Sequence, residues 1–301
     1  FSHMELHDQM FGDDFCKEIN QARQALQLPA VSNWKAWLYS PCKILCGWPI
    51  WYAQKDETWP DCAEPIGFLK DPHMDDEAVF EPMINDLLST AAERGRKTVI
   101  ITGGSSRMVS RDFYRTAIEA CELAEVSAII VTPYQEYIPQ NLPDTMIWEK
   151  YAPLRHLMKK VDLVIHHGGM GTINEAIDAA VPQIVMPHLT DGPDNADRLE
   201  RLGIAAKFSP KMWDSARIAA RIKEMLSDST GLCCQKFKDM NGQTYTDQLW
   251  KKAIEQIEPY ELPVQKEKQP QAEKKNPANR QMSREMLLKI LQKKKEKEKQ
   301  Q

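Results

Sequence analysis

The chain has 301 residues, 42% of them hydrophobic, which is enough to bury the core of one large domain or two smaller ones. Its net charge of −4 gives no global argument for binding nucleic acid, whose binders usually show a basic face. Its seven cysteines lack paired CxxC spacing, which favours separate thiols in a reducing cytosol over a disulfide framework or a metal site. We therefore expect a cytoplasmic protein that binds neither nucleic acid nor metal.

Residues 1–60 are rich in Trp, Pro and Cys and predict one helix, around 12–27. Ile19 and Ala22 lie there at helical spacing, and Pro29 follows the run. No basic region precedes an apolar run, so we expect no signal peptide. No apolar stretch approaches the roughly 20 residues that a membrane-spanning helix needs. The first residue is not Met, which hints at a fragment or a processed chain.

The middle of the chain alternates apolar, strand-like runs with amphipathic, helix-like runs. Strands separated by helices indicate parallel pairing with right-handed crossovers. The strand-like runs are continuously apolar, which is typical of a sheet covered by helices on both faces. The predicted fold class is therefore α/β, a Rossmann-like doubly wound parallel sheet. The expected strands are 97–104, 127–132, 146–148, 161–167 and 182–187, and the expected helices are 111–124, 173–180, 194–202 and 215–227.

Beyond Pro259 the composition changes to Lys, Glu, Gln and Pro, so residues 258–301 are expected to be a charged, largely disordered tail. A helix is possible after Ser283, with Met286 and Ile290 on one face. Two interpretations stay open, a solvated extension and a docking helix for a partner protein. Glutamates interrupt the lysines, which argues against a nucleic-acid patch.

A glycine-rich turn in VDLVIHHGGMGTINEAIDAA (161–180) joins a buried strand to a helix. Ile173, Ala176 and Ala180 form part of the apolar stripe that predicts this helix. Unpaired amides and the helix dipole at such a turn bind phosphate, and glycines let the backbone come close to the anion. The alternative is that the glycines only allow tight packing and that the two histidines are satisfied core groups.

The run HHGGMGTINEA…AVPQIVMPHLTDGPDNADRLERLG (166–203) resembles the donor-binding signature of the UDP-glycosyltransferase family. It looks like the bacterial antibiotic and fungal sterol glucosyltransferases. The resemblance covers roughly residues 17–227 and includes a weaker match, KILCGWPIWYAQKDETWPDCAEPIGFLKD (43–71). It implies a GT-B fold, in which two Rossmann-like domains face each other across the active site. Residues 61–257 would be the C-terminal, donor-binding domain, and residues 1–60 would be a remnant of an otherwise missing N-terminal acceptor domain with its linker.

The resemblance also implies roles for individual residues at each part of a nucleotide-sugar. The donor diphosphate would be bound by His167, the Gly171 backbone, Thr172, Ser105 and Asn195, the ribose by Glu175, the base by Tyr151 and the Ala152 backbone, and the sugar by Asp191. The alternative role for Tyr151 is that of a partly buried packing aromatic.

Two positions depart from the family pattern. Gly192 stands where the family commonly has a sugar-contacting glutamine, which puts the identity of the sugar and efficient transfer in doubt. Leu154 stands where many members have glutamine, so selectivity for the base is also open. Neither His3 nor His7 precedes a strand, so neither matches the general base expected in the N-terminal domain.

The implied function is inverting transfer of a hexose from a UDP-sugar, or a TDP-sugar, to a hydroxyl of a lipid or natural-product acceptor. No cofactor and no metal are expected. The chain would be part of a longer enzyme or would act with a separate acceptor-domain chain. The alternative is a non-catalytic nucleotide-sugar-binding or scaffold protein. An epimerase is disfavoured, and a dinucleotide oxidoreductase lacks its GxGxxG fingerprint.

Overall fold

The computed structural model divides the chain into two units, Phe1–Ile257 and Glu258–Gln301. The second unit, with the helix expected after Ser283, lies outside the described residues. None of the described helices is long and apolar enough to cross a membrane. The structure describes residues 3–34, 44–68, 79–105, 107–188, 190–227 and 230–244.

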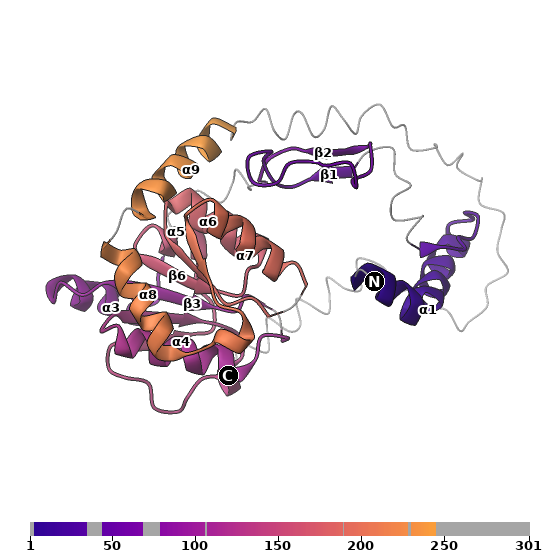
Figure 1. The fold of residues 1–301 in the computed structure, drawn as a ribbon. Helices are drawn as coiled ribbons and strands as arrows, with labels where there is room; N and C mark the ends of the chain where they lie inside the picture. Colours follow the sequence, from indigo (N-terminus) through magenta and orange to yellow (C-terminus); the bar gives the residue numbers. More distant parts are fainter. Residues whose placement is uncertain are drawn as a thin grey trace, which may run out of the picture. The chain divides into compact units, whose positions relative to one another are not determined.

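The described residues form a parallel sheet, in which Figure 1 labels β3 and β6. The sheet has six strands, in the order β5-β4-β3-β6-β7-β8. The chain builds outward from β3 in one direction and then from β6 in the other, which is the doubly wound order. The predicted α/β fold class is therefore confirmed. The strands are β3 (Thr98–Thr102), β4 (Ser127–Val131), β5 (Met146–Glu149), β6 (Leu163–His166), β7 (Gln183–Val185) and β8 (Ala205–Lys207).

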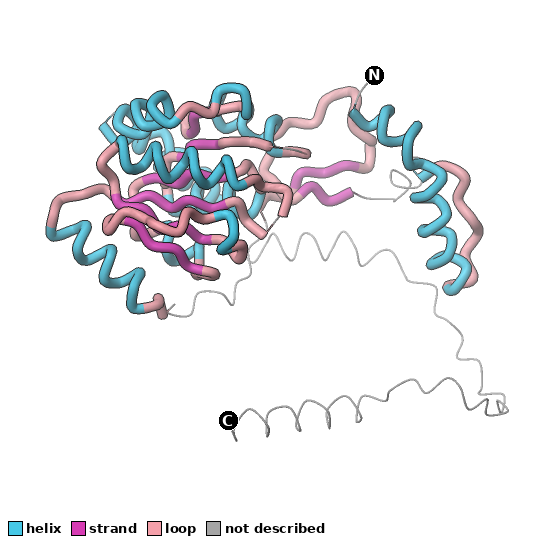
Figure 2. The backbone as a smooth tube through the Cα atoms, turned by 90° about the horizontal axis from the view of Figure 1, so that it is seen from below, coloured by secondary structure: helices cyan, strands magenta, loops and turns pink. Residues whose placement is uncertain are grey.

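Helices cover both faces of this sheet, as Figure 2 shows. Alternate residues of β3 face opposite ways: Val99 and Ile101 pack under α4 and α8, whereas Ile100 packs under α3, α5 and α6. This two-sided burial explains why the strands are apolar at every position. The helices of the domain are α3 (Pro82–Glu93), α4 (Arg111–Leu123), α5 (Leu154–Met158), α6 (Met170–Ala179), α7 (Gly192–Arg201) and α8 (Ser215–Ser227), with short 3-10 turns η1 (Gln135–Tyr137) and η2 (Pro210–Met212).

The N-terminal part contributes helix α1 (His3–Ala25), which begins earlier than the expected 12–27. It also contributes a small parallel pair, β1 (Ile44–Cys46) and β2 (Ala63–Pro65). The segment between these two strands carries Tyr52, which joins an apolar cluster with residues of α6, α7 and the last described helix, α9 (Thr230–Thr244). Residues 44–68 are thus anchored on the α/β domain.

A candidate nucleotide-sugar donor site

The site lies where the strand order reverses. Thr102, the last residue of β3, is paired with His166, the last residue of β6. The loops that follow these two strands therefore begin side by side at the carboxyl edge of the sheet, where ligands bind in doubly wound folds. Helix α6 begins at Met170 directly after the glycine turn, and no side chain caps its first amides. Those amides and the helix dipole favour an anion at this point.

His167 is held between two glycine backbones. A Cβ atom on Gly104 would lie 2.9 Å from the ring carbon Cε1, and one on Gly169 would lie 2.7 Å from Nε2. Both distances are shorter than real carbon contacts, so only glycine fits at either position while the ring stays in place. The loop after β3 and the turn after β6 thus fix the orientation of one imidazole.

A second close approach involves Gly168 and Gly192. Gly168 has a φ of +96°, and a Cβ on it would lie 2.9 Å from the Cα of Gly192. A Cβ on Gly192 would lie 2.7 Å from the carbonyl oxygen of His167. The glycine that replaces the expected glutamine therefore belongs to the packing of this turn. In this geometry a longer side chain at position 192 has no room beside His167.

The two adjacent histidines have different environments. His166 is fully buried: its Nδ1 accepts the Gly168 N–H at 3.1 Å, so its Nε2 carries the proton and donates to Gln183 Oε1 at 3.0 Å. Burial lowers the pKa of His166 to about 3, with the neighbouring His167 adding to the effect. His166 is therefore a neutral core group. The alternative that both histidines are satisfied core groups thus applies to His166.

This arrangement predicts a pH-dependent contribution to stability. Between the ordinary His pKa of 6.5 and the folded value of about 3, the unfolded chain binds a proton at His166 that the folded chain does not. The free energy of unfolding should therefore decrease as the pH is lowered through this window, by up to about 1.4 kcal/mol per pH unit from this group. The His166→Asn variant should lose that slope in denaturant titrations between about pH 6 and 4.5. Equal slopes in both proteins would refute this assignment.

His167 is only partly buried, and its Nδ1 has no hydrogen-bond partner among the described residues. Burial lowers the pKa of His167, while the charge of Asp191 and a hydrogen bond to the Thr102 backbone oppose that shift. The ring is therefore neutral at pH 7, and one of its nitrogens, Nδ1, is buried without a hydrogen-bond partner among the described residues. An anion beside it would favour the protonated form, in which both nitrogens donate.

Asn195 connects the glycine turn to the start of α7. Its Nδ2 donates to the carbonyl oxygen of Gly168 and to Asp191 Oδ2, each at 2.9 Å, and its Oδ1 accepts the hydroxyl of Tyr52 at 2.9 Å. Asp191 is also bonded to the Thr190 hydroxyl, at 2.9 Å. Asn195 lies at the turn, as expected, but both of its amide hydrogens are already engaged within the protein.

The other residues expected at the diphosphate differ in exposure. Thr172 is buried in the first turn of α6. Gly171 is exposed, and apart from its chain neighbours and the backbone of its own helix no described atom lies within 4 Å of where its Cβ would be. Ser105 is exposed, and its carbonyl oxygen accepts the Tyr134 hydroxyl at 2.6 Å, which ties the loop after β3 to the end of β4. These three residues lie on loops or helix starts at the same edge of the sheet.

The residues expected at the ribose and base lie on α5, α6 and the link before α5. The ring of Tyr151 is 73% exposed and so is accessible to a base, whereas Ala152 is buried. Glu175 Oε2 lies 3.8 Å from Arg155 Nε, in an ion pair that the sequence reasoning missed. Since α5 directly follows Tyr151, this pair links the proposed base platform to the proposed ribose carboxylate. The side chain of Arg155 is only 12% exposed.

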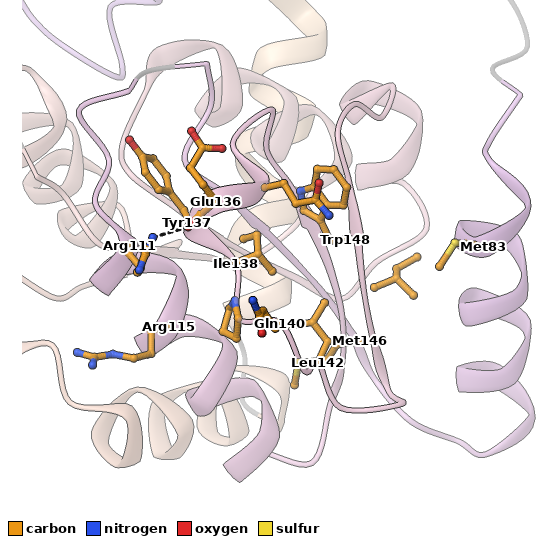
Figure 3. A pocket seen from close by; sticks show the side chains of 13 residues that line it. Met83, Arg111, Arg115, Glu136, Tyr137, Ile138, Gln140, Leu142, Met146 and Trp148 are labelled. Atoms are coloured by element: carbon orange, nitrogen blue, oxygen red, sulfur yellow. Dashed lines mark hydrogen bonds between the residues drawn. The ribbon is translucent and has the colours of Figure 1, made fainter.

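A cavity of about 1040 Å³ lies elsewhere, along β5 and the start of α4 (Figure 3). Trp148, Met146 and Leu142 form part of its apolar wall. Its two arginines are engaged within the chain, because Arg111 donates to the Glu136 carbonyl oxygen at 2.7 Å and Arg115 pairs with an aspartate one turn away on α4. The glycine turn does not line this cavity.

This doubly wound fold is shared with GT-B glycosyltransferases, of whose solved structures the chain covers only part. The glycosyltransferase of kitacinnamycin has this fold: the two structures superpose with a TM-score of 0.64 at 18% identity, over 84% of this chain and 64% of that one. Within this class, residues 118–241 match the family model of the erythromycin biosynthesis protein CIII-like C-terminal domain. The resemblance predicted from the sequence is therefore confirmed.

Proteins with similar sequences include glycosyltransferases of fungi and bacteria. A sterol 3-beta-glucosyltransferase of Saccharomyces cerevisiae is 25% identical over 56% of this chain and 15% of that protein. The NDP-glycosyltransferase YjiC of Bacillus licheniformis is 26% identical over 58% of this chain and 44% of that protein. An O-mycaminosyltylonolide 6-deoxyallosyltransferase of Streptomyces fradiae is 30% identical over 49% of this chain and 34% of that protein. The chain thus spans less than half the length of each of these relatives.

Proposed function

We propose that this chain binds a nucleotide-sugar, with UDP as the nucleotide, and supplies the donor site of a glycosyltransferase. The observation that carries the proposal is the His167 ring, clamped between Gly104 and Gly169 beside the uncapped start of α6. The ring nitrogen and the amides would bind the diphosphate, Glu175 the ribose and Tyr151 the base. Asp191 would bind sugar hydroxyls. TDP is the alternative nucleotide.

The reaction we propose is transfer of a hexose, with inversion, to a hydroxyl of a lipid or natural-product acceptor. The acceptor oxygen bonds to the sugar carbon while the bond from that carbon to the diphosphate breaks. The diphosphate leaves with the electron pair, and donors already in place stabilise its negative charge. A base takes the hydroxyl proton, and we assign that role to no described residue, in line with a separate acceptor domain.

Calorimetry with UDP and TDP tests the donor site. The chain should bind UDP equally well with and without EDTA, since no metal has a role in this proposal. A double variant, His167→Ala with Thr172→Ala, should lose more than about 100-fold in affinity, because two hydrogen bonds to a charged group are removed. A folded chain that binds neither nucleotide would refute the proposal.

Gly192 favours a second candidate, a non-catalytic protein that binds nucleotide-sugars. The glutamine expected to contact the sugar is absent, and a Cβ at position 192 would meet the His167 carbonyl. Both candidates would bind UDP-glucose, so release of UDP from UDP-glucose separates them. Release that the His167→Ala variant loses would indicate a transferase site. Binding of UDP-glucose without release would favour the non-catalytic protein.

A further inference from the structure

We propose that Tyr52 and Asn195 are positioning residues that hold the donor-binding turn in its working geometry. Through them, the segment between β1 and β2 controls whether the donor site is formed. The inference rests on the proposed donor function, and it gives Asn195 a different role from that of a direct diphosphate ligand. Both side chains are only 4% exposed, and they are 143 residues apart in sequence.

The side-chain amide of Asn195 uses both of its hydrogens within the protein. An asparagine amide has two hydrogens, and those of Asn195 go to the Gly168 carbonyl and the Asp191 carboxylate. Both partners accept only, so the amide nitrogen must face them and the amide oxygen must face Tyr52. Burial raises the pKa of the Tyr52 hydroxyl, which therefore stays protonated and donates. To bind a phosphate, Asn195 would have to break one of these bonds.

Asn195 also fixes the direction of a backbone amide, because the peptide bond is planar. The carbonyl of Gly168 and the N–H of Gly169 belong to one planar unit and point in opposite directions. When Asn195 holds the Gly168 oxygen, it also fixes the direction of the Gly169 N–H. That amide directly precedes the first residue of α6, next to the groups assigned to the diphosphate. Glycine on both sides of this bond leaves the backbone free to rotate without such a restraint.

Asp191 is the other group that Asn195 holds. Asn195 and Thr190 each bond one oxygen of its carboxylate. The charge of Asp191 acts on His167 and partly offsets the lowering of that ring's pKa by burial. Asn195 therefore positions a backbone amide and a carboxylate. Through the carboxylate it also influences the protonation of His167.

Tyr52 ties this arrangement to a different part of the chain. Its ring packs on Phe68 with centroids 5.5 Å apart, and both belong to the apolar cluster that includes Ile173 of α6 and Leu199 of α7. The hydroxyl is the polar end of this anchor. Movement of residues 44–68 would therefore change the hydrogen bond between Tyr52 and Asn195, and through Asn195 it would change the turn.

The test compares variants of the whole 301-residue chain. Tyr52→Phe removes only the hydroxyl, and Asn195→Ala removes all three bonds. The matched control is Asn241→Ala, because Asn241 is also fully buried and its Nδ2 donates to Asp178 Oδ1 at 2.9 Å, near the far end of α6. The readouts are UDP affinity by calorimetry, unfolding midpoint in urea, and the NMR signal of the Gly169 amide.

We expect Tyr52→Phe to weaken UDP binding by about three- to tenfold and to shift the Gly169 signal in the free protein. Asn195→Ala should do more of both, and Asn241→Ala should lower stability without changing either. If the unaltered chain binds UDP and Tyr52→Phe binds it equally well with an unshifted Gly169 signal, the positioning role is overturned. If the unaltered chain binds no UDP, the proposed function is overturned instead, and the Gly169 signal still decides whether Tyr52 holds the turn.

Discussion

Replacing Gly168 by alanine should destabilise the folded chain by about 3 kcal/mol. At a φ of +96° a side chain is strained, and its Cβ would lie 2.9 Å from the Cα of Gly192 and 3.0 Å from the carbonyl oxygen of that residue. Both neighbouring atoms belong to the backbone, so neither can move aside as a flexible side chain does. Urea denaturation would show the change as a lower midpoint at an unchanged slope.

Gly171→Ala is the matched control, three residues along the same turn and helix. Apart from its chain neighbours and the backbone of its own helix, no described atom lies within 4 Å of where its Cβ would be, and alanine favours helix more than glycine. We expect its stability to be unchanged or raised by up to about 1 kcal/mol. Equal losses in the two variants would show that the close approach of Gly168 and Gly192 does not constrain this turn.

Binding of UDP-glucose should strengthen as the pH falls through the range in which His167 becomes protonated. The neutral ring carries one proton, whereas a bound diphosphate and the Thr102 backbone each offer a place for a donated hydrogen. Donor binding is therefore expected to raise the pKa of His167 and to take up a proton. Affinity should rise by up to about tenfold per pH unit below the pKa of the complex, and should level off below the lowered pKa of the free protein.

Calorimetry between about pH 5.5 and 8 measures this dependence. UDP-glucose is the suitable ligand, because its diphosphate is esterified at both ends and does not titrate in this range. His167→Asn should bind more weakly and show no slope, whereas His166 stays neutral throughout because of its pKa of about 3. A pH-independent affinity in the unaltered chain would contradict the assignment of His167 to the diphosphate.

The sequence predicted the strand, turn and helix of the site because their signals are local. The apolar run before His166, the glycines and the stripe on α6 lie within about twenty adjacent residues, and the structure places β6 and α6 there. Helix α3 was missed although Pro82 at its start and Gly95 after its end are ordinary helix signals. Strands β1, β2 and β8 have three residues each, too few to show a pattern.

The contacts that hold the site could not be predicted, because they depend on tertiary distance. Nothing near Tyr52 in the sequence indicates a hydrogen bond to Asn195, 143 residues away. The fit of Gly192 against the His167 carbonyl likewise appears only when α7 is docked on the sheet. From the family resemblance alone, Gly192 was a missing sugar ligand and Asn195 a phosphate ligand. The structure gives both a place in the packing of the turn.

The central claim is that the turn after β6 binds a nucleotide diphosphate, and NMR mapping tests it most directly. Addition of UDP to the ¹⁵N-labelled chain should shift the amide signals of Gly168, Gly169, Gly171 and Thr172 most strongly, with smaller shifts at Ser105. The result that would contradict the account is saturable binding with the largest shifts around Met146 and Trp148, in the cavity beside β5, and none at the turn.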